Sequence, residues 1–252
     1  MNGGPGGGSA AGRRDETGDE IGDETGDETG DEIGDEISVW SMGVPPAGEF
    51  GGYDLRVLDA EERRRMARYR RAEDRARYGF AHVTLRRILA ARLDVAPRAV
   101  RFRREPCPVC AGPHGRPALD APSTRTRFSL SHRGQRVLIA VAERTVGVDV
   151  EAVPGGTTVT GVARALHPAE RAAIEAAPPA GRGAAFARAW ARKEAYLKGI
   201  GTGLGRGLGE DDTGAPIPGW RVVDLPVDAA HAAALAVRSP RQPAISMRHS
   251  PP

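Results

Sequence analysis

Lysine is nearly absent from this chain of 252 residues. Of its 36 basic residues only Lys193 and Lys198 are lysines, and all the others are arginines. An arginine bias of this size is typical of a GC-rich genome. Because an ammonium group is compact and a guanidinium group is broad, two lysines five residues apart suggest a place where a compact cation is required.

Cysteines, aromatic residues and long apolar runs are also scarce. The two cysteines, Cys107 and Cys110, are too few for a secreted fold held together by disulfides. No apolar run reaches the ~18 residues of a membrane-spanning helix, and the N-terminus lacks the basic-then-apolar layout of a signal peptide. Hydrophobic residues make up 40% and aromatic residues 5% of the chain, so we expect a cytoplasmic, monomeric protein with a core of Ala, Leu and Val.

Negative charge is concentrated at one end of the chain. Residues 1–37 hold twelve acidic residues and two arginines in a repeat of Gly-Asp-Glu-X. Subtracting them from the totals of 36 basic and 33 acidic residues gives residues 38–252 a formal charge of +13. Dense like charge with few apolar residues predicts a disordered tail over residues 1–41. Met42 is an alternative start that would leave this tail untranslated. A basic body suits a polyanionic ligand or an acidic partner.

The rest of the chain predicts an α+β fold of two similar halves. Apolar periodicity predicts helices at residues 59–77 and 80–93, then strands at 100–103, 128–131, 137–141 and 146–150. Helices at 159–166, 168–176 and 184–198 and strands at 220–225 and 232–237 follow. We place the N-terminal half at residues 50–145, the C-terminal half at 146–240 and a tail at 241–252.

A pair of carboxylates marks the strand at Gly147-Val-Asp-Val-Glu151. Alternate strand residues share a face, so Asp149 and Glu151 lie together and repel unless a cation or a proton lies between them. Oxygen ligands of this kind suit Mg²⁺, which commonly binds one or two carboxylates and substrate phosphates. A strand with a solvated acidic face is the alternative.

A second pattern lies on the helix that contains both lysines. Trp190, Glu194 and Lys198 follow one another at intervals of four residues and so lie in one row. The row offers an apolar anchor, a third possible metal ligand and a cation for a phosphate. The alternative is a Glu194–Lys198 surface ion pair on a helix that ends at glycines.

Ser131 and His132 end the strand Phe128-Ser-Leu-Ser-His132. A serine beside a histidine suggests nucleophilic catalysis. Adjacent strand residues point to opposite faces, however, so hydrogen bonding to a ligand phosphate is the better interpretation.

The ordered series of motifs resembles a known family. GRP at 115–117, FSLSH at 128–132, GVDVE at 147–151 and WARKEAYLKGIGTGL at 190–204 look like the motifs of the surfactin-synthetase-type 4′-phosphopantetheinyl transferases. The Arg-rich segment EERRRMARYRRAEDRAR resembles the N-terminal helical segment of that family. The last two motifs are specific as a pair, and the resemblance covers roughly residues 50–240.

This resemblance implies an activity and a set of residues. The enzyme would transfer phosphopantetheine from coenzyme A to a serine of an acidic apo acyl or peptidyl carrier protein in polyketide, nonribosomal peptide or fatty acid synthesis. Coenzyme A would lie in the cleft between two α+β halves. The implied magnesium ligands are Asp149, Glu151 and Glu194, with Glu194 as a possible base. The implied coenzyme contacts are Arg65, Gly115, Arg116, Pro117, Ser131, His132, Lys193 and Lys198.

Two other interpretations stay open at the level of sequence. Clustered arginines between Arg63 and Arg77 favour a nucleic-acid-binding protein, and the acidic residues favour a metal-dependent nuclease. The first leaves Asp149, Glu151 and Glu194 unexplained, since clustered acids repel phosphate unless a metal is bound. Cys107, Cys110 and His114 resemble half of a zinc site, which usually needs four ligands; free thiols are the default interpretation.

Overall fold

The computed structural model describes residues 1, 3, 36–46, 53–155 and 159–250. Residues 4–35 of the predicted acidic tail lie outside the described residues. From residue 36 onward, all described residues belong to one unit, Ile33–Pro252. No helix among the described residues has both the length and the apolar composition needed to cross a membrane.

Over the described residues, two larger sheets, one two-stranded hairpin and five α-helices make up this α+β fold. The first sheet has the strand order β4-β5-β1-β9, the second has the order β6-β8-β7, and β2 and β3 form a separate hairpin. The strands are β1 (Glu36–Gly43), β2 (Phe102–Arg104), β3 (Pro117–Leu119), β4 (Arg127–Arg133), β5 (Arg136–Ala142), β6 (Val146–Ala152), β7 (Trp220–Leu225), β8 (His231–Arg238) and β9 (Ala244–Arg248). The helices are α1 (Ala60–Ala67), α2 (Ala72–Leu93), α3 (Val159–Ala163), α4 (Pro168–Ala176) and α5 (Arg182–Ile200).

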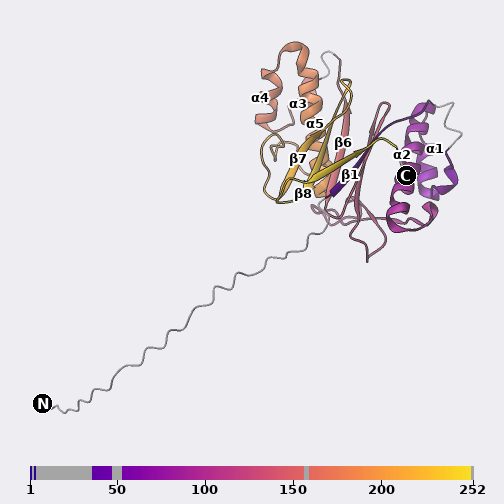
Figure 1. The fold of residues 1–252 in the computed structure, drawn as a ribbon. Coiled ribbons are helices and arrows are strands. Elements are labelled where there is room, and N and C mark those ends of the chain that lie inside the picture. Colours follow the sequence, from indigo (N-terminus) through magenta and orange to yellow (C-terminus); the bar gives the residue numbers. More distant parts are fainter. Residues whose placement is uncertain (2, 4–35, 47–52, 156–158, 251–252) are drawn as a thin grey trace, which may run out of the picture. The chain divides into compact units, whose positions relative to one another are not determined.

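The elements are layered, with the sheets inside and the helices outside. Figure 1 shows α1 and α2 on one side of the strands and α3, α4 and α5 on the other. Side chains on β5 alternate accordingly. Val137, Ile139 and Val141 contact the cluster that contains α2, whereas Leu138 and Ala140 join the cluster shared with β6 and β8. The period of two along this strand therefore builds two cores.

Serine side chains join the two sheets along β4 and β6. The hydroxyl of Ser129 accepts a hydrogen bond from the backbone N–H of Val148 at 3.0 Å, and that of Ser131 accepts one from Val150 at 3.4 Å. Both hydroxyls are buried. The residues predicted to carry chemistry on β4 and β6 are thus held in a fixed register.

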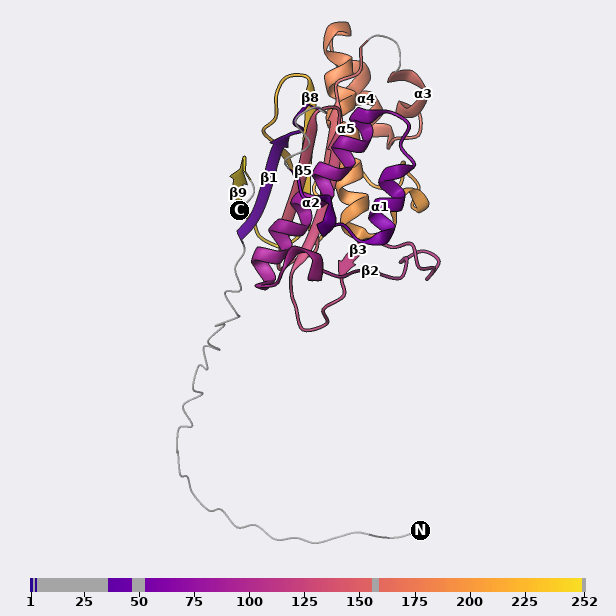
Figure 2. The ribbon, with the colours of Figure 1, turned by 90° about the vertical axis from the view of Figure 1, so that its right-hand side faces the viewer.

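Strands near both ends of the chain correct the predicted bounds of the N-terminal and C-terminal tails. Strand β1 pairs antiparallel with β5 and parallel with β9, so it lies inside the first sheet, next to β9 (Figure 2). Its residues Ile37, Val39, Trp40 and Met42 are buried. The predicted tails at residues 1–41 and 241–252 are therefore wrong for residues 36–41 and 244–248, because these segments form strands of the first sheet.

The two sheets share an order of elements along the chain. Apart from the β2–β3 hairpin in the first series and α3 in the second, one strand is followed by a short helix, a long helix and two further strands: β1, α1, α2, β4, β5 and then β6, α4, α5, β7, β8. The strand orders β4-β5-β1 and β7-β8-β6 correspond, and all of these pairings are antiparallel. A long helix covers the outer face of each sheet.

Each long helix also carries one buried cation. Arg86 of α2 is paired with Glu62 of α1 at 2.7 Å, and Lys193 of α5 is paired with Glu170 of α4 at 3.0 Å. Both glutamates belong to capping boxes, in which the side chain returns to the backbone N–H that precedes its own helix. In each case an ion pair therefore fixes the N-terminus of the short helix to the side of the long helix.

Candidate active site

A cavity of about 610 Å³ lies between α1, α2, the β2–β3 hairpin, β4 and the C-terminal end of α5. Its lining is rich in cationic and imidazole side chains. These are Arg65, Arg103, Arg104, Arg116, Lys198, His82, His114 and His132. Three carboxylates, those of Asp59, Glu61 and Glu62, also line the cavity. The five cationic side chains outnumber them, so the site is suited to an anionic ligand.

Lys198 connects this cavity to the carboxylates behind it. Its ammonium donates to Asp149 Oδ1 at 2.6 Å and to the carbonyl of Val148 at 3.3 Å. The hydroxyl of Ser131 donates to the same Asp149 oxygen at 2.8 Å. The Glu194–Lys198 ion pair considered as an alternative is therefore replaced by a pair with Asp149.

Close packing of β6 against α5 makes this contact possible. Gly147 faces α5, and a Cβ at this position would overlap the backbone at Ala195 and Gly199. Glycine permits the strand and the helix to approach each other. Asp149 and Glu151 are two and four residues further along the strand, so they face the same helix.

Each of the three carboxyl groups in the predicted metal set has a raised pKa, and burial is the largest cause in every case. Burial raises the pKa of Asp149 despite the nearby Lys198. Burial raises the pKa of Glu151 as well, and the charge of Asp149 adds to the effect. The pKa of Glu194 rises through burial and through the charges of Asp149 and Glu151. The set therefore lacks compensating positive charge, since Lys198 offsets only part of it.

These residues fit a divalent cation. Asp149 Oδ2 is buried and has no hydrogen-bond partner among the described residues, and an unpaired buried carboxylate oxygen is costly unless a cation compensates it. The donor set consists of carboxylate oxygens, which suit Mg²⁺. In this structure the three carboxylates do not bring one oxygen atom each to within 4.8 Å of the others. Among the described residues, the ligand atoms of Cys107, Cys110 and His114 do lie that close together.

The predicted nucleotide contacts gather at the mouth of the cavity. Arg65, Gly115, Arg116 and Pro117 all line it. Arg116 is ion-paired with Glu105 at 2.6 Å and donates to the carbonyl of Gly199 at 2.6 Å, so it also caps the end of α5. The GRP motif thus joins the hairpin to the helix that carries Lys198.

The Ser131–His132 pair is divided between two environments. His132 lines the cavity, whereas Ser131 is buried and holds Asp149. Of the two residues, His132 is therefore the one that faces the cavity, whereas Ser131 orients a carboxylate. Burial and the nearby Arg77 lower the pKa of His132 to about 4, so its imidazole is neutral at pH 7.

The burial of Lys193 contradicts the prediction that this lysine contacts a phosphate. Its side chain is 1% exposed, and its ammonium is bound to Glu170 and to the carbonyl of Asp211. The glutamate accepts two more hydrogen bonds from Thr213. Helical geometry explains the error, because residues five apart point to different faces of a helix.

The Arg-rich segment does not present a uniform basic face. Arg86 is buried, Arg75 donates to the carbonyls of Tyr69 and Arg70, and Arg77 donates to the carbonyl of Gly134. Arg64, Arg65 and Arg68 are exposed beside the cavity. Part of the predicted nucleic-acid signal is therefore structural.

Several cavity residues were not predicted from the sequence. They are Tyr69, Tyr78, His82, Arg103, Arg104 and His114. They come from a loop, a helix and a hairpin, and no single motif contains them. The one available signal was the density of basic residues on both sides of Phe102.

Comparisons with known proteins agree with this geometry. Residues 145–240 match the family model of the 4′-phosphopantetheinyl transferase superfamily. Over 102 residues the chain is 33% identical to "Putative 4'-phosphopantetheinyl transferase slr0495" of Synechocystis sp.. This match spans 40% of the chain and 38% of the relative. Both findings show that part of the chain is similar to 4′-phosphopantetheinyl transferases, and the segment that matches the family model contains Asp149, Glu151, Glu194 and Lys198.

Proposed function

We propose that this protein transfers the 4′-phosphopantetheine group of coenzyme A to a serine of an apo acyl or peptidyl carrier protein, as the surfactin-synthetase-type enzymes do. The observation that carries the proposal is the position of Lys198. Its ammonium lies between a basic cavity and the buried, partly unpaired carboxylate of Asp149.

Coenzyme A would lie in the cavity with its charged groups on the basic lining. Arg65 and His132 would receive the 3′-phosphate of the ribose, and the loop Gly115–Pro117 would contact the adenine. A neutral His132 can donate one hydrogen bond without repelling the arginines around it. The diphosphate would then reach Lys198.

Asp149, Glu151 and Glu194 would hold Mg²⁺ together with the diphosphate oxygens. When bound there, the ion supplies charge neutralisation for the diphosphate. Ser131 fixes the orientation of Asp149, and the backbone of β6 fixes the spacing to Glu151. The raised pKa values of these carboxyl groups support this role, since a cation is what would lower them again.

The reaction is a displacement at the β-phosphorus of coenzyme A. The serine hydroxyl of the carrier attacks this phosphorus, its proton passes to Glu194, and the bond to the leaving phosphate oxygen breaks to release 3′,5′-ADP. Glu194 would take this proton directly or through a water molecule. Lys198 stabilises the charge that builds on the diphosphate oxygens.

An acidic carrier protein would dock beside the cavity. Arg64, Arg65 and Arg68 on α1 and Arg103 and Arg104 on β2 are exposed there. These side chains give the rim a positive potential that attracts an acidic partner and speeds its association.

The two halves of the fold would be related by a pseudo-twofold axis. The corresponding strand orders and the matching buried ion pairs support this arrangement. We assign residues 50–145 with β1 and β9 to the first half, and residues 146–240 to the second. The cavity would then lie at their junction, with the carboxylates from the second half.

The test is transfer to a purified apo carrier. Wild-type protein with coenzyme A and Mg²⁺ should add one phosphopantetheine group to the carrier, measured by intact mass, with one 3′,5′-ADP released per carrier. Asp149→Asn and Glu151→Gln should each reduce kcat/KM by at least ~100-fold. The matched control is a carrier whose acceptor serine is changed to alanine. Transfer by either variant at close to the wild-type rate would exclude the carboxylates from the reaction.

A further inference from the structure

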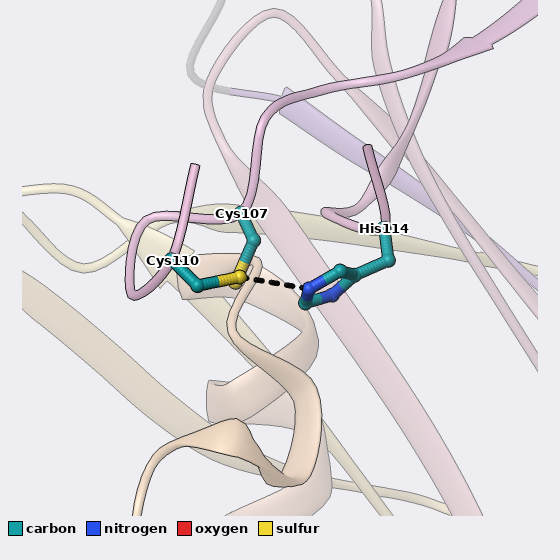
Figure 3. A group of neighbouring side chains, drawn as sticks. All are labelled: Cys107, Cys110 and His114. Atoms are coloured by element: carbon teal, nitrogen blue, oxygen red, sulfur yellow. Dashed lines mark hydrogen bonds between the residues drawn. The ribbon is translucent and has the colours of Figure 1, made fainter. Parts of the chain in front are cut away.

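A second cluster of ligating side chains lies at the tip of the β2–β3 hairpin. Figure 3 shows the thiols of Cys107 and Cys110 and the imidazole of His114 turned toward one another. Their ligand atoms all lie within 4.8 Å of one another, and Cys110 Sγ is 2.9 Å from His114 Nε2. A tetrahedral zinc ion, with Zn–S near 2.3 Å and Zn–N near 2.0 Å, separates its ligand atoms by about 3.5–3.8 Å.

The backbone around Cys107 is arranged to favour a thiolate. The backbone N–H groups of Cys110 and Val109 donate hydrogen bonds to its sulfur. The next turn is closed by a hydrogen bond from Ala111 to the carbonyl of Cys107 at 2.8 Å. Ala111 adopts φ 58°, a left-handed conformation that is unfavourable for a residue other than glycine. The loop therefore keeps a strained turn that brings the second thiol back to the first.

The chemistry of these three groups selects the metal. Thiolate and imidazole are soft ligands that suit Zn²⁺, whereas Mg²⁺ prefers oxygen. Two thiolates and a neutral imidazole also balance the charge of a divalent cation. Cys107 is buried while Cys110 and His114 are exposed, so one side of the cluster is open to water.

We propose that Cys107, Cys110 and His114 bind one Zn²⁺ ion per chain, with a water molecule in the fourth position. The bound ion stabilises the hairpin loop in the conformation that places Gly115 and Arg116 at the cavity. Gly115 already lies against the backbone of Glu105, where a Cβ would overlap the carbonyl oxygens of Glu105 and Pro106. His114 is both a zinc ligand and a cavity residue, so the loop and the cavity are ordered together.

The experiment measures metal directly and does not depend on transferase activity. The full chain is purified under reducing conditions without chelators, and its zinc content is measured by mass spectrometry. It is then stripped and titrated with Co²⁺, which gives visible d–d bands and a thiolate charge-transfer band when it binds two thiolates. We expect one Zn²⁺ per chain and a thiolate–Co²⁺ spectrum that Zn²⁺ abolishes.

Variants of the exposed ligands keep the test independent of folding. Cys110→Ser and His114→Gln should each lower the Co²⁺ affinity at least tenfold and increase hydrogen exchange across residues 105–117. Val109→Ala, which removes an exposed side chain between the cysteines, is the matched control and should bind as wild type does. A zinc content below one fifth of an ion per chain, or a Cys107–Cys110 disulfide in the reduced preparation, would overturn the proposal.

Discussion

The sheet that contains β1 and the sheet that contains β6 each pack against a long helix, but they differ in what these two strands present to that helix. Facing α2, strand β1 presents Trp40 and Met42, which belong to the first core. Facing α5, strand β6 presents Asp149 and Glu151. One sheet therefore uses this interface for packing, and the other uses it to hold charge.

The buried ion pairs show what these two regions have in common. Arg86 spans from Glu62 and Asp59 to the carbonyl of Val100, whereas Lys193 binds Glu170 and one carbonyl. Both pairs attach a short helix to a long one. Because these ion pairs lie apart from the carboxylates Asp149 and Glu151, stability and activity should respond to different substitutions.

The largest expected effect is loss of the first strand. A chain that starts at residue 44 lacks β1, which buries four large apolar side chains worth about 1.5–3 kcal/mol each. This sum is comparable to the whole stability of a domain, so we expect no cooperative unfolding transition by circular dichroism. A chain that starts at residue 36 retains the strand and should melt as the full chain does. Equal melting of both truncated chains would mean that β1 is dispensable.

The next effect compares the two buried cations. Arg86→Met and Lys193→Met should each cost about 3–5 kcal/mol in the free energy of unfolding, because each leaves a buried glutamate unpaired. Urea denaturation measures the loss. Arg92→Met breaks the more exposed pair with Glu143 and should cost less than about 1 kcal/mol. If Arg86→Met or Lys193→Met also cost less than about 1 kcal/mol, the buried ion pairs would not be what holds the short helices to the long ones.

The two lysines should separate activity from stability. Lys198→Ala should lower kcat/KM for coenzyme A by about 2–4 kcal/mol in transition-state stabilisation, and Lys198→Arg should recover part of it, because the guanidinium keeps the charge but changes its geometry. Lys193→Met should keep its activity per folded molecule. The assay uses saturating apo carrier, with a thermal melt for each variant. If kcat/KM fell less than fivefold in Lys198→Ala, the ion pair between Lys198 and Asp149 would be structural and Lys198 would have no role in the reaction.

The smallest effect is a pH dependence carried by His132. Its pKa is about 4 in the fold and about 6.5 in an unfolded chain. Between these two pH values, His132 binds a proton in the unfolded chain but not in the folded chain. The contribution of His132 to the free energy of unfolding is therefore fully present above about pH 6.5 and is lost as the pH falls. The loss should reach about 2 kcal/mol at pH 5. Denaturation curves at pH 7 and pH 5 should show this loss shrink in His132→Asn but persist in the control His249→Asn.

Local patterns predicted most of the helices and strands, and long-range pairing explains the failures. The predicted helix at residues 168–176 and strand at 220–225 agree with α4 and β7 residue for residue. Strand β1 was missed because an acidic repeat precedes it and its partners lie far away in sequence. Its buried Ile37, Val39 and Met42 were a usable signal.

The candidate site was predicted in parts. Alternation on β6 correctly put Asp149 and Glu151 on one face, and helical spacing put Lys198 on the side of α5 that meets them. Spacing alone could not tell that Ser131 binds a carboxylate or that Lys193 is buried, because both depend on elements distant in sequence. The capping boxes at Asp59–Glu62 and His167–Glu170 were recognisable, but their buried partners were not.

The central place of β1 has a consequence for synthesis. At roughly 5–20 residues per second, the ribosome completes β1 on the order of ten seconds before β5, its first partner. An apolar strand with open edges is an aggregation hazard during this interval. The acidic repeat directly before it carries twelve carboxylates within residues 1–37. We expect this charge to keep neighbouring nascent chains apart, a gatekeeping role that ends once the sheet closes.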